Sequence, residues 1–215
     1  MDKVVAYESA VADPWTRQVV LMADNSPDPA GDFPADSDDL AALVLNPPYQ
    51  TNKIYLGRMP YQTASLARAG VLNALNQGAA YFSYMGHGNP SQLANEKLLL
   101  QSDVTALSNG GRQPVALFLT CAAVRFSLPG YDSLGEALVL KHNGGAIAVW
   151  GPTGLSLNSE AKQLAEGFFT ETFWMGGNRM LGESAFEAYQ HYGTNRYRFI
   201  LDIYNILGDP ALRMK

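Results

Sequence analysis

Apolar runs of strand length recur along the first 150 residues of the chain. Each run is continuous rather than alternating, which is typical of strands that are buried on both faces of a parallel sheet. The sequence therefore predicts five buried strands. They cover residues 18–23, 53–57, 79–85, 114–120 and 145–150.

Between these runs lie segments whose apolar residues recur at helical spacing, and three of the first four end at glycine, a common helix stop. Alternating strands and helices predict right-handed crossovers and an α/β fold, with a mostly parallel sheet and helices on both of its faces. After residue 150 the pattern is mainly helical. The predicted helices cover residues 37–45, 64–78, 95–111, 133–145, 159–174 and 179–193.

Composition supports a covered sheet and excludes some partners. Only 16% of residues are charged and 47% are hydrophobic, so many side chains must be buried. The net charge of -5 comes without a basic cluster, which argues against nucleic acid as a partner. The longest apolar run, residues 114–124, falls short of the roughly 20 residues of a membrane span.

Candidate chemistry lies directly after the apolar runs, because ligands of open parallel sheets bind at the carboxyl ends of the strands. His87 follows one predicted strand and Cys121, the only cysteine, follows another. An imidazole and a thiol on the same edge would form a base and a nucleophile. The alternative interpretation is a small buried hydrophobe and a turn histidine.

The two glycines that flank His87 give this candidate site a further function. They allow a substrate backbone to come close, and the amide of Gly88 can point at a developing oxyanion. The amide of Cys121 is the second candidate donor. Motifs for dinucleotides, for phosphate loops, and the GxSxG and HExxH patterns are absent from the sequence.

The segments "YMGHGNP" and "LFLTCAAVRF" resemble the gingipain family of cysteine peptidases, and the resemblance extends over nearly the whole chain, to the closing "YNILGDPAL". It implies a caspase-like three-layer sandwich. It also implies that Cys121 is the nucleophile, that His87 transfers protons, and that the amides of Gly88 and Cys121 hold the oxyanion. By position, Asp24 matches the acidic residue that orients the histidine, with an Asx turn as the alternative.

The resemblance also implies residues for substrate binding. Asp36 is the nearest match to the aspartate that selects Arg or Lys before the cut, although Asp36 or Ser37 could instead cap the helix. Trp150 or Thr153 would line the pocket wall. No metal or organic cofactor is required, and calcium would be structural.

Aspartates 24, 28, 32 and 36 are candidate calcium ligands, with a solvated acidic loop as the alternative.

Residues 1–215 are thus predicted to be one caspase-like catalytic subdomain, excised from a longer secreted or surface protein. The opening "MDKVVAYE" has the pattern of the tail of a helix whose beginning is missing. Gingipains carry another α/β subdomain ahead of this region and an immunoglobulin-like domain behind it, and both are missing partners here. The predicted function is a cysteine endopeptidase that acts on peptides or proteins. A catalytically silent module for protein binding or secretion is the alternative.

Overall fold

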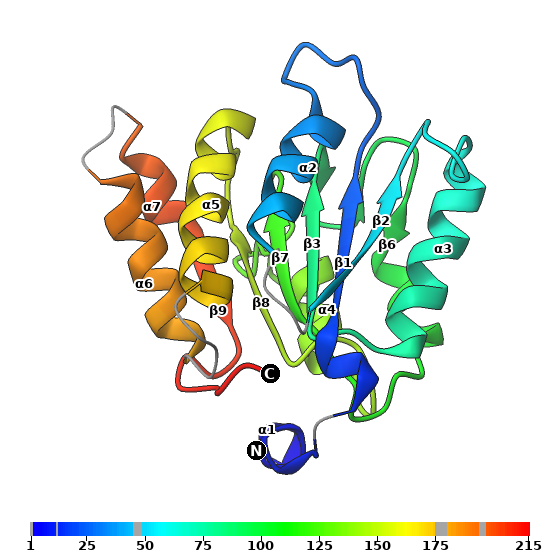
Figure 1. Cartoon of the computed structure of the whole chain (residues 1–215), viewed down its shortest axis with the longest axis vertical. Coiled ribbons are helices and arrows are strands. Elements are labelled where there is room, and N and C mark those ends of the chain that lie inside the picture. The colour runs from blue at the N-terminus through cyan, green and yellow to red at the C-terminus, as the bar shows by residue number, and fades with distance from the viewer. Residues whose placement is uncertain (1, 12, 45–48, 175–179, 194–196) are drawn as a thin grey trace.

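The computed structural model describes residues 2–11, 13–44, 49–174, 180–193 and 197–215. In this part of the chain a six-stranded sheet lies between layers of helices, which confirms the predicted α/β fold (Figure 1). The strand order is β2-β1-β3-β7-β8-β9. The strands are β1 Gln18–Ala23, β2 Gln50–Tyr55, β3 Tyr81–Met85, β7 Val115–Leu119, β8 Ala148–Pro152 and β9 Tyr204–Leu207.

The register of the sheet brings three strand ends to the same level. Ala23 at the end of β1 pairs with Met85 at the end of β3, and Met85 pairs with Leu119 at the end of β7, all in parallel. The residues that follow these strands therefore begin at one edge, the upper edge in Figure 1. Within the described strands of this six-stranded sheet, only β9 runs against its neighbour, pairing antiparallel with β8.

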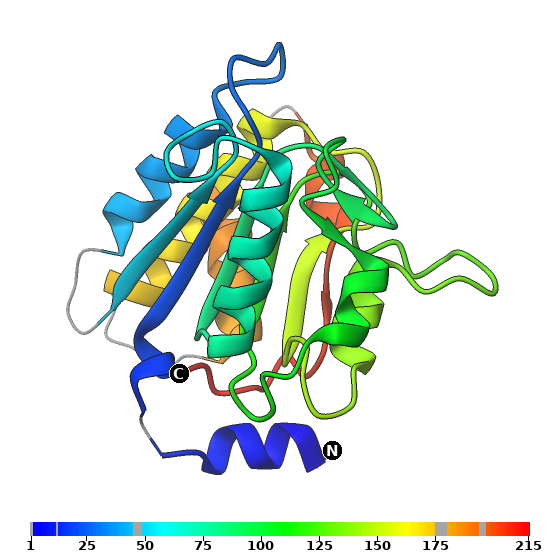
Figure 2. The same cartoon turned by 90° about the vertical axis from the view of Figure 1, so that its right-hand side faces the viewer.

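Helices cover both faces of the sheet. One face carries α2, α5 and α6, and the other carries α3 and α4, as the two views show together (Figures 1 and 2). The short α1 lies beyond the edge of the sheet at which the strands begin (Figure 2). The helices are α1 Asp2–Ser9, α2 Phe33–Leu43, α3 Ala64–Gln77, α4 Leu134–Leu140, α5 Asn158–Trp174, α6 Leu181–Tyr192 and α7 Phe199–Ile203.

The core is divided in two by the sheet, because neighbouring side chains of a strand point to opposite faces. In β1, Val19 and Leu21 join the cluster under α2 and α5, whereas Val20 and Met22 join the cluster under α3 and α4. All four side chains are almost fully buried. This burial on both faces explains why the strands have continuous apolar runs.

The predicted helix over residues 95–111 is wrong. The structure has the two-residue strand β6 Leu99–Leu100 there, followed by the 3-10 helix η2 Gln101–Ala106. β6 closes a small antiparallel sheet with β4 Gly88–Asn89 and β5 Gln92–Leu93. A short apolar run suits a buried strand as well as a helix, and here strand pairing decides the outcome.

Several further boundaries differ from prediction. β2 covers Gln50–Tyr55 rather than residues 53–57, and α4 ends at Leu140 rather than at residue 145. α2 begins at Phe33, earlier than predicted, because the side chain of Asp32 accepts a hydrogen bond from the Ala35 amide and so caps the helix. This replaces the predicted cap at Asp36 or Ser37. The last residue of that predicted helix, residue 45, lies outside the described residues.

The strand predicted over 145–150 begins later, at Ala148, and β9 was not predicted at all. Among the described residues, no helix is long and apolar enough to cross a membrane.

Candidate active site

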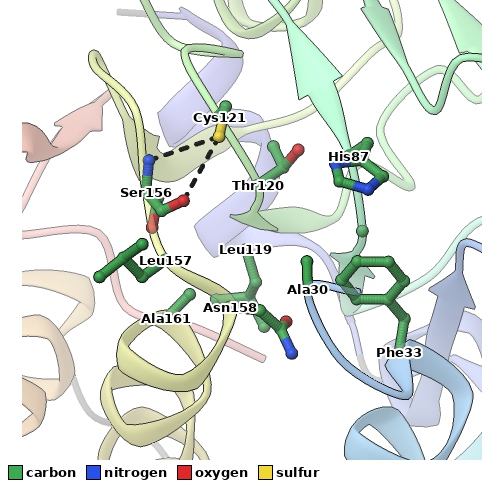
Figure 3. A pocket seen from close by; sticks show the side chains of 11 residues that line it. Ala30, Phe33, His87, Leu119, Thr120, Cys121, Ser156, Leu157, Asn158 and Ala161 are labelled. Atoms are coloured by element: carbon green, nitrogen blue, oxygen red, sulfur yellow. Dashed lines mark hydrogen bonds between the residues drawn. The ribbon is translucent and has the colours of Figure 1, made fainter. Parts of the chain in front are cut away.

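The edge at which β1, β3 and β7 end holds a pocket that contains both His87 and Cys121. The pocket is small, with a volume of about 130 Å³. Its lining residues come from four segments of the chain, whose side chains converge on the pocket in Figure 3. It is lined by Ala30, Phe33, Gly86, His87, Leu119, Thr120, Cys121, Ser156, Leu157, Asn158 and Ala161.

The thiol of Cys121 is half-buried and faces the loop before α5. The Ser156 amide donates a hydrogen bond to Sγ at 3.4 Å, and the thiol donates to the Ser156 carbonyl, also at 3.4 Å (Figure 3). In the described part of the chain, no hydrogen bond joins Cys121 to His87. The two side chains therefore share a pocket, while the thiol is held by the backbone of Ser156.

The imidazole of His87 is held by Asp28. The distance from Nε2 to Asp28 Oδ2 is 3.1 Å, and the ring packs edge-on against Phe33 with 5.3 Å between ring centroids. The Ala30 amide donates to Asp28 Oδ1 at 2.7 Å. This backbone hydrogen bond, followed by the one from His87, lowers the pKa of Asp28, so that the group remains a carboxylate.

Asp24 does not contact the imidazole as predicted. Its carboxylate accepts a hydrogen bond from the backbone amide of His87 at 3.2 Å and from the Asn25 amide at 2.9 Å. The side chain is buried beneath the loop, and this burial raises the pKa of Asp24. Asp24 thus holds the backbone of His87, whereas Asp28 forms the hydrogen bond to its imidazole ring.

The glycines beside His87 are required by close packing. Gly86 has φ +152°, and a Cβ there would clash with Asp24 and Tyr84. A Cβ on Gly88 would clash with the Thr120 hydroxyl. The absence of side chains therefore lets the histidine loop lie directly against the ends of β1 and β7.

The backbone just after the candidate nucleophile is strained. Ala122 has φ +51°, a left-handed conformation that residues other than glycine seldom adopt. Its amide donates to the Gly154 carbonyl at 2.8 Å, which ties the turn to the loop after β8. Non-glycine residues in such conformations cluster at functional sites, where the surrounding structure imposes them.

Asp36 lies behind the pocket and does not line it. Its Oδ2 accepts a hydrogen bond from Asn158 Nδ2 at 2.7 Å, and its Oδ1 forms an ion pair with Lys162 Nζ at 3.0 Å. Asn158 lines the pocket in its place. The predicted substrate-binding carboxylate is therefore paired within the chain.

Neither predicted wall residue lines this pocket. Trp150 is fully buried in the core, where its ring stacks on Phe168 with 5.1 Å between ring centroids. The Thr153 hydroxyl donates to the Ile203 carbonyl at 3.1 Å. The wall is instead formed further along the same loop, by Ser156 and Leu157.

The four candidate calcium ligands do not gather at one point. Asp24 contacts the His87 amide, and Asp28 contacts the His87 imidazole. Asp32 caps the start of α2, and Asp36 is bonded to Asn158 and Lys162. Among the described residues, no group of three or more His, Cys, Asp or Glu side chains could hold a metal ion. These aspartates do not fit the donor set that calcium takes.

Sequence reasoning missed three residues of this site: Asp28, Asn158 and Lys162. The sequence indicates Asp28 only as a candidate calcium ligand or as part of a solvated acidic loop, and its sole signal for this site is its position a few residues after a strand. Asn158 and Lys162 belong to α5, whose helical pattern carries no sign that its first turns face the thiol. Contacts between segments distant in sequence are needed to find them.

The structure thus places a histidine and a cysteine in one pocket at the carboxyl edge of the neighbouring strands β3 and β7. The model of peptidase family C25 matches residues 1–215, and the chain belongs to this family. This membership confirms the family resemblance that the sequence predicts.

Solved structures agree on the fold. The Arg-specific cysteine proteinase gingipain R (RgpB) aligns with a TM-score of 0.85 at 19% identity, covering 100% of this chain and 51% of that one. The complex of the pro- and mature domains of RgpB from Porphyromonas gingivalis aligns with a TM-score of 0.83 at 19% identity, covering 100% of this chain and 52% of that one. Caspase-1 from Spodoptera frugiperda aligns with a TM-score of 0.58 at 11% identity, covering 89% of this chain and 86% of that one. No curated protein sequence matches.

The chain thus spans about half the length of the two gingipain structures.

Proposed function

We propose that this chain hydrolyses peptide bonds, with Cys121 as the nucleophile and His87 as the group that transfers protons. One observation carries this proposal: the only cysteine and a carboxylate-bonded histidine line the same small pocket at the edge of a parallel sheet. Membership of peptidase family C25 supports the same reaction.

In the proposed reaction, the thiol turns from Ser156 toward the imidazole, which takes its proton. The thiolate then attacks the scissile carbonyl carbon, and the carbonyl oxygen becomes an oxyanion. As the tetrahedral intermediate collapses, the C–N bond breaks and His87 gives the proton to the leaving amine. A water molecule, deprotonated by His87, attacks the thioester and releases the acid and the thiol.

Two further groups complete the proposal. The donors for the oxyanion are the amide of Gly88, which directly follows the histidine, and the amide of the nucleophile Cys121 itself. Asp28 acts as a positioning residue: its carboxylate at 3.1 Å from Nε2 orients the ring and stabilises its protonated form. The nitrogen that faces the thiol is then Nδ1.

The finer parts of the sequence-based prediction belong to this proposal as well. Peptides or proteins are the substrates, no metal or organic cofactor takes part, and the location is extracellular or at the cell surface, by family resemblance. A preference for Arg or Lys before the cut would require a free carboxylate in the pocket, whereas Asp36 is bonded to Lys162.

The test is cleavage of a fluorogenic peptide library by the intact chain and by Cys121→Ala, with reductant present and calcium varied. We expect cleavage by the intact chain and a loss of at least about 1,000-fold in Cys121→Ala, because removing a nucleophile leaves only binding and oxyanion contributions. His87→Ala should lose a similar factor. Far-UV circular dichroism controls for the fold of each variant.

Cleavage that survives in Cys121→Ala would contradict the proposed nucleophile. If the folded chain cleaves no peptide at any calcium concentration, the alternative function gains weight: a caspase-fold module that serves in protein binding or secretion. The position of the thiol, bonded to Ser156 rather than to His87, is the observation that favours this alternative.

A further inference from the structure

The pocket beside Cys121 is bounded on the side of α5 by Asn158, the first residue of that helix. Figure 3 shows the Asn158 side chain pointing across the pocket toward Ala30 and Phe33. A side chain that enters next to the thiol would therefore meet an amide. The charge and the hydrogen-bonding capacity of this end of the pocket decide which side chains it accepts.

The carboxylate behind this amide is neutralised within the chain. Asp36 lies 3.0 Å from Lys162 Nζ, and the two side chains are only 20% and 22% exposed. Lys162 also lies 2.6 Å from Asp39, but that side chain is 64% exposed, so solvent screens its charge. Behind the Asn158 amide, an incoming Arg or Lys would find the Asp36 carboxylate already paired with the Lys162 ammonium.

The orientation of Asn158 is fixed by the same carboxylate. A carboxylate can only accept hydrogen bonds, so the Asn158 group at 2.7 Å from Asp36 Oδ2 must be the NH₂ group. The other amide atom, Oδ1, is then turned away from Asp36. Oδ1 is buried and has no hydrogen-bond partner among the described residues. A buried acceptor without a partner costs free energy that a donor from a ligand would recover.

The Thr120 hydroxyl is a second buried polar group of the pocket without a partner in the described chain. Thr120 is only 3% exposed. The remaining wall is mainly apolar, with Phe33, Leu119 and Ala161. The volume of about 130 Å³ approaches that of the ~150 Å³ cavity that holds benzene, so one side chain of moderate length fits.

We propose that this pocket binds an uncharged side chain that donates a hydrogen bond, with glutamine as the best fit, and that Asn158 and the Asp36–Lys162 pair set this specificity. The inference rests on the proposed function, since it names the residue before the cut. Glutamine places its methylene groups against the apolar wall and its NH₂ group on Asn158 Oδ1. A glutamate carboxylate has only hydrogen-bond acceptors and would face Asn158 Oδ1, which is also an acceptor. Methionine has no donor and would leave Oδ1 without a partner.

Peptide binding tests this specificity without catalysis. Five peptides that differ only in one residue, Gln, Met, Glu, Arg or Lys, are titrated into Cys121→Ala by calorimetry. We expect the Gln peptide to bind roughly tenfold more tightly than the others, the ratio that one satisfied buried hydrogen bond gives. Arg or Lys binding as tightly as Gln, Met binding as tightly as Gln, or no binding at all would overturn the proposal.

Removing the lysine should reverse the preference. In Cys121→Ala/Lys162→Met the Asp36 carboxylate keeps the hydrogen bond from Asn158 but loses its ion-pair partner at Oδ1. We therefore expect the Arg and Lys peptides to gain at least roughly tenfold in affinity through a charge-assisted bond. Lys162→Gln replaces this variant if Lys162→Met does not fold. Lys53→Met is the matched control. Lys53 forms an ion pair at 2.7 Å with Asp38, which lies on α2 as Asp36 does, but Lys53 does not line the pocket.

An unchanged preference in the Lys162 variants would overturn the role of the pair. Cleavage by the chain with Cys121 intact distinguishes this failure from a failure of the proposed function. Cysteine-dependent cleavage after Arg or Lys would retain the peptidase and reject the glutamine pocket. Selective binding of the Gln peptide without any cleavage would retain the pocket and reject the peptidase.

Discussion

At the scale of single residues, Cys121 and His87 are each bonded to a group other than each other. The thiol is held by the Ser156 backbone and the imidazole by Asp28. Catalytic hydrogen bonds are often long or unformed before substrate binds, so this arrangement is compatible with catalysis. A rotation about the Cα–Cβ bond of Cys121 is the step that the proposed mechanism requires before attack.

Asp28 makes the stability of the chain depend on pH. Its pKa is lowered in the fold, first by the Ala30 amide and then by His87. A lowered carboxyl pKa contributes stability above the unfolded value, about 3.9, and this contribution is lost as the pH falls through the folded value. We therefore expect the intact chain to lose more stability than Asp28→Asn between pH 5 and pH 3.

Urea denaturation at the two pH values measures this difference. At pH 5 the variant should be the less stable protein, and the two should converge toward pH 3. Asparagine can still accept the Ala30 amide, so the variant keeps the local turn. Equal losses in both proteins would show that the Asp28 carboxylate makes no net contribution to the fold.

At the scale of elements, the turn after β7 joins two loops of the candidate site. Ala122 donates to Gly154 at 2.8 Å and Val124 donates to Pro152 at 3.1 Å, so the segment after Cys121 is bonded to the end of β8 and the loop that follows. The left-handed φ of +51° at Ala122 is the conformation that makes this connection. The thiol and Ser156 are thereby held on the same rigid unit.

A β-branched residue should not tolerate this turn. We expect Ala122→Val to destabilise the chain by about 2 kcal/mol, because valine in the left-handed region is strained and the site is buried. Thermal and urea unfolding measure the loss. Ala122→Gly is the control, since glycine adopts this φ without strain and gives up only one methyl group. Equal stability of the two variants would contradict a strained turn.

The elements that sequence predicts best are those with one dominant local signal. β1 and β3 are buried on both faces, so their apolar runs mark them directly, and α3 ends at Gly78 as its pattern predicts. β6 and η2 were mistaken for a helix because their apolar run is short and their structure depends on pairing with β5.

The site follows the same division. Cys121 and His87 are found from the sequence because each comes directly after a buried strand. Asp28 contacts His87 from a loop and Asn158 lines the pocket from a helix start, and tertiary contacts position both. The sequence indicates Asp36 as a substrate-binding residue by its position alone. It carries no sign that Lys162 pairs with this carboxylate.

At the scale of the whole molecule, the sheet separates two cores and collects the candidate chemistry at one edge. The cluster under α2 and α5 and the cluster under α3 and α4 share no side chains, since alternate residues of each strand serve each face. The pocket at this edge shares Phe33, Leu119 and Ala161 with the cluster under α2 and α5. Substitutions at a partly exposed lining residue outside both clusters, such as Asn158, can therefore change binding without disturbing either core.

The two ends of the described chain meet at the opposite edge of the molecule. The Arg213 amide donates to the Glu8 carboxylate at 2.9 Å, and the Lys215 amide donates to the Tyr7 hydroxyl at 3.2 Å. Figure 1 shows both ends below the sheet, away from the edge at which β1, β3 and β7 end. A surface tether attached to either end would thus leave the pocket facing the solution.

The chain can accordingly be immobilised through either end without loss of substrate access. Under the proposed function, we expect the kcat/KM of a chain tethered through either end to match that of the untethered chain, because both ends lie away from the pocket (Figure 1). A large loss from one tether alone would mean that this end reaches the pocket. The geometry that joins the ends thus also determines how the molecule can be mounted on a bead, a sensor or another protein.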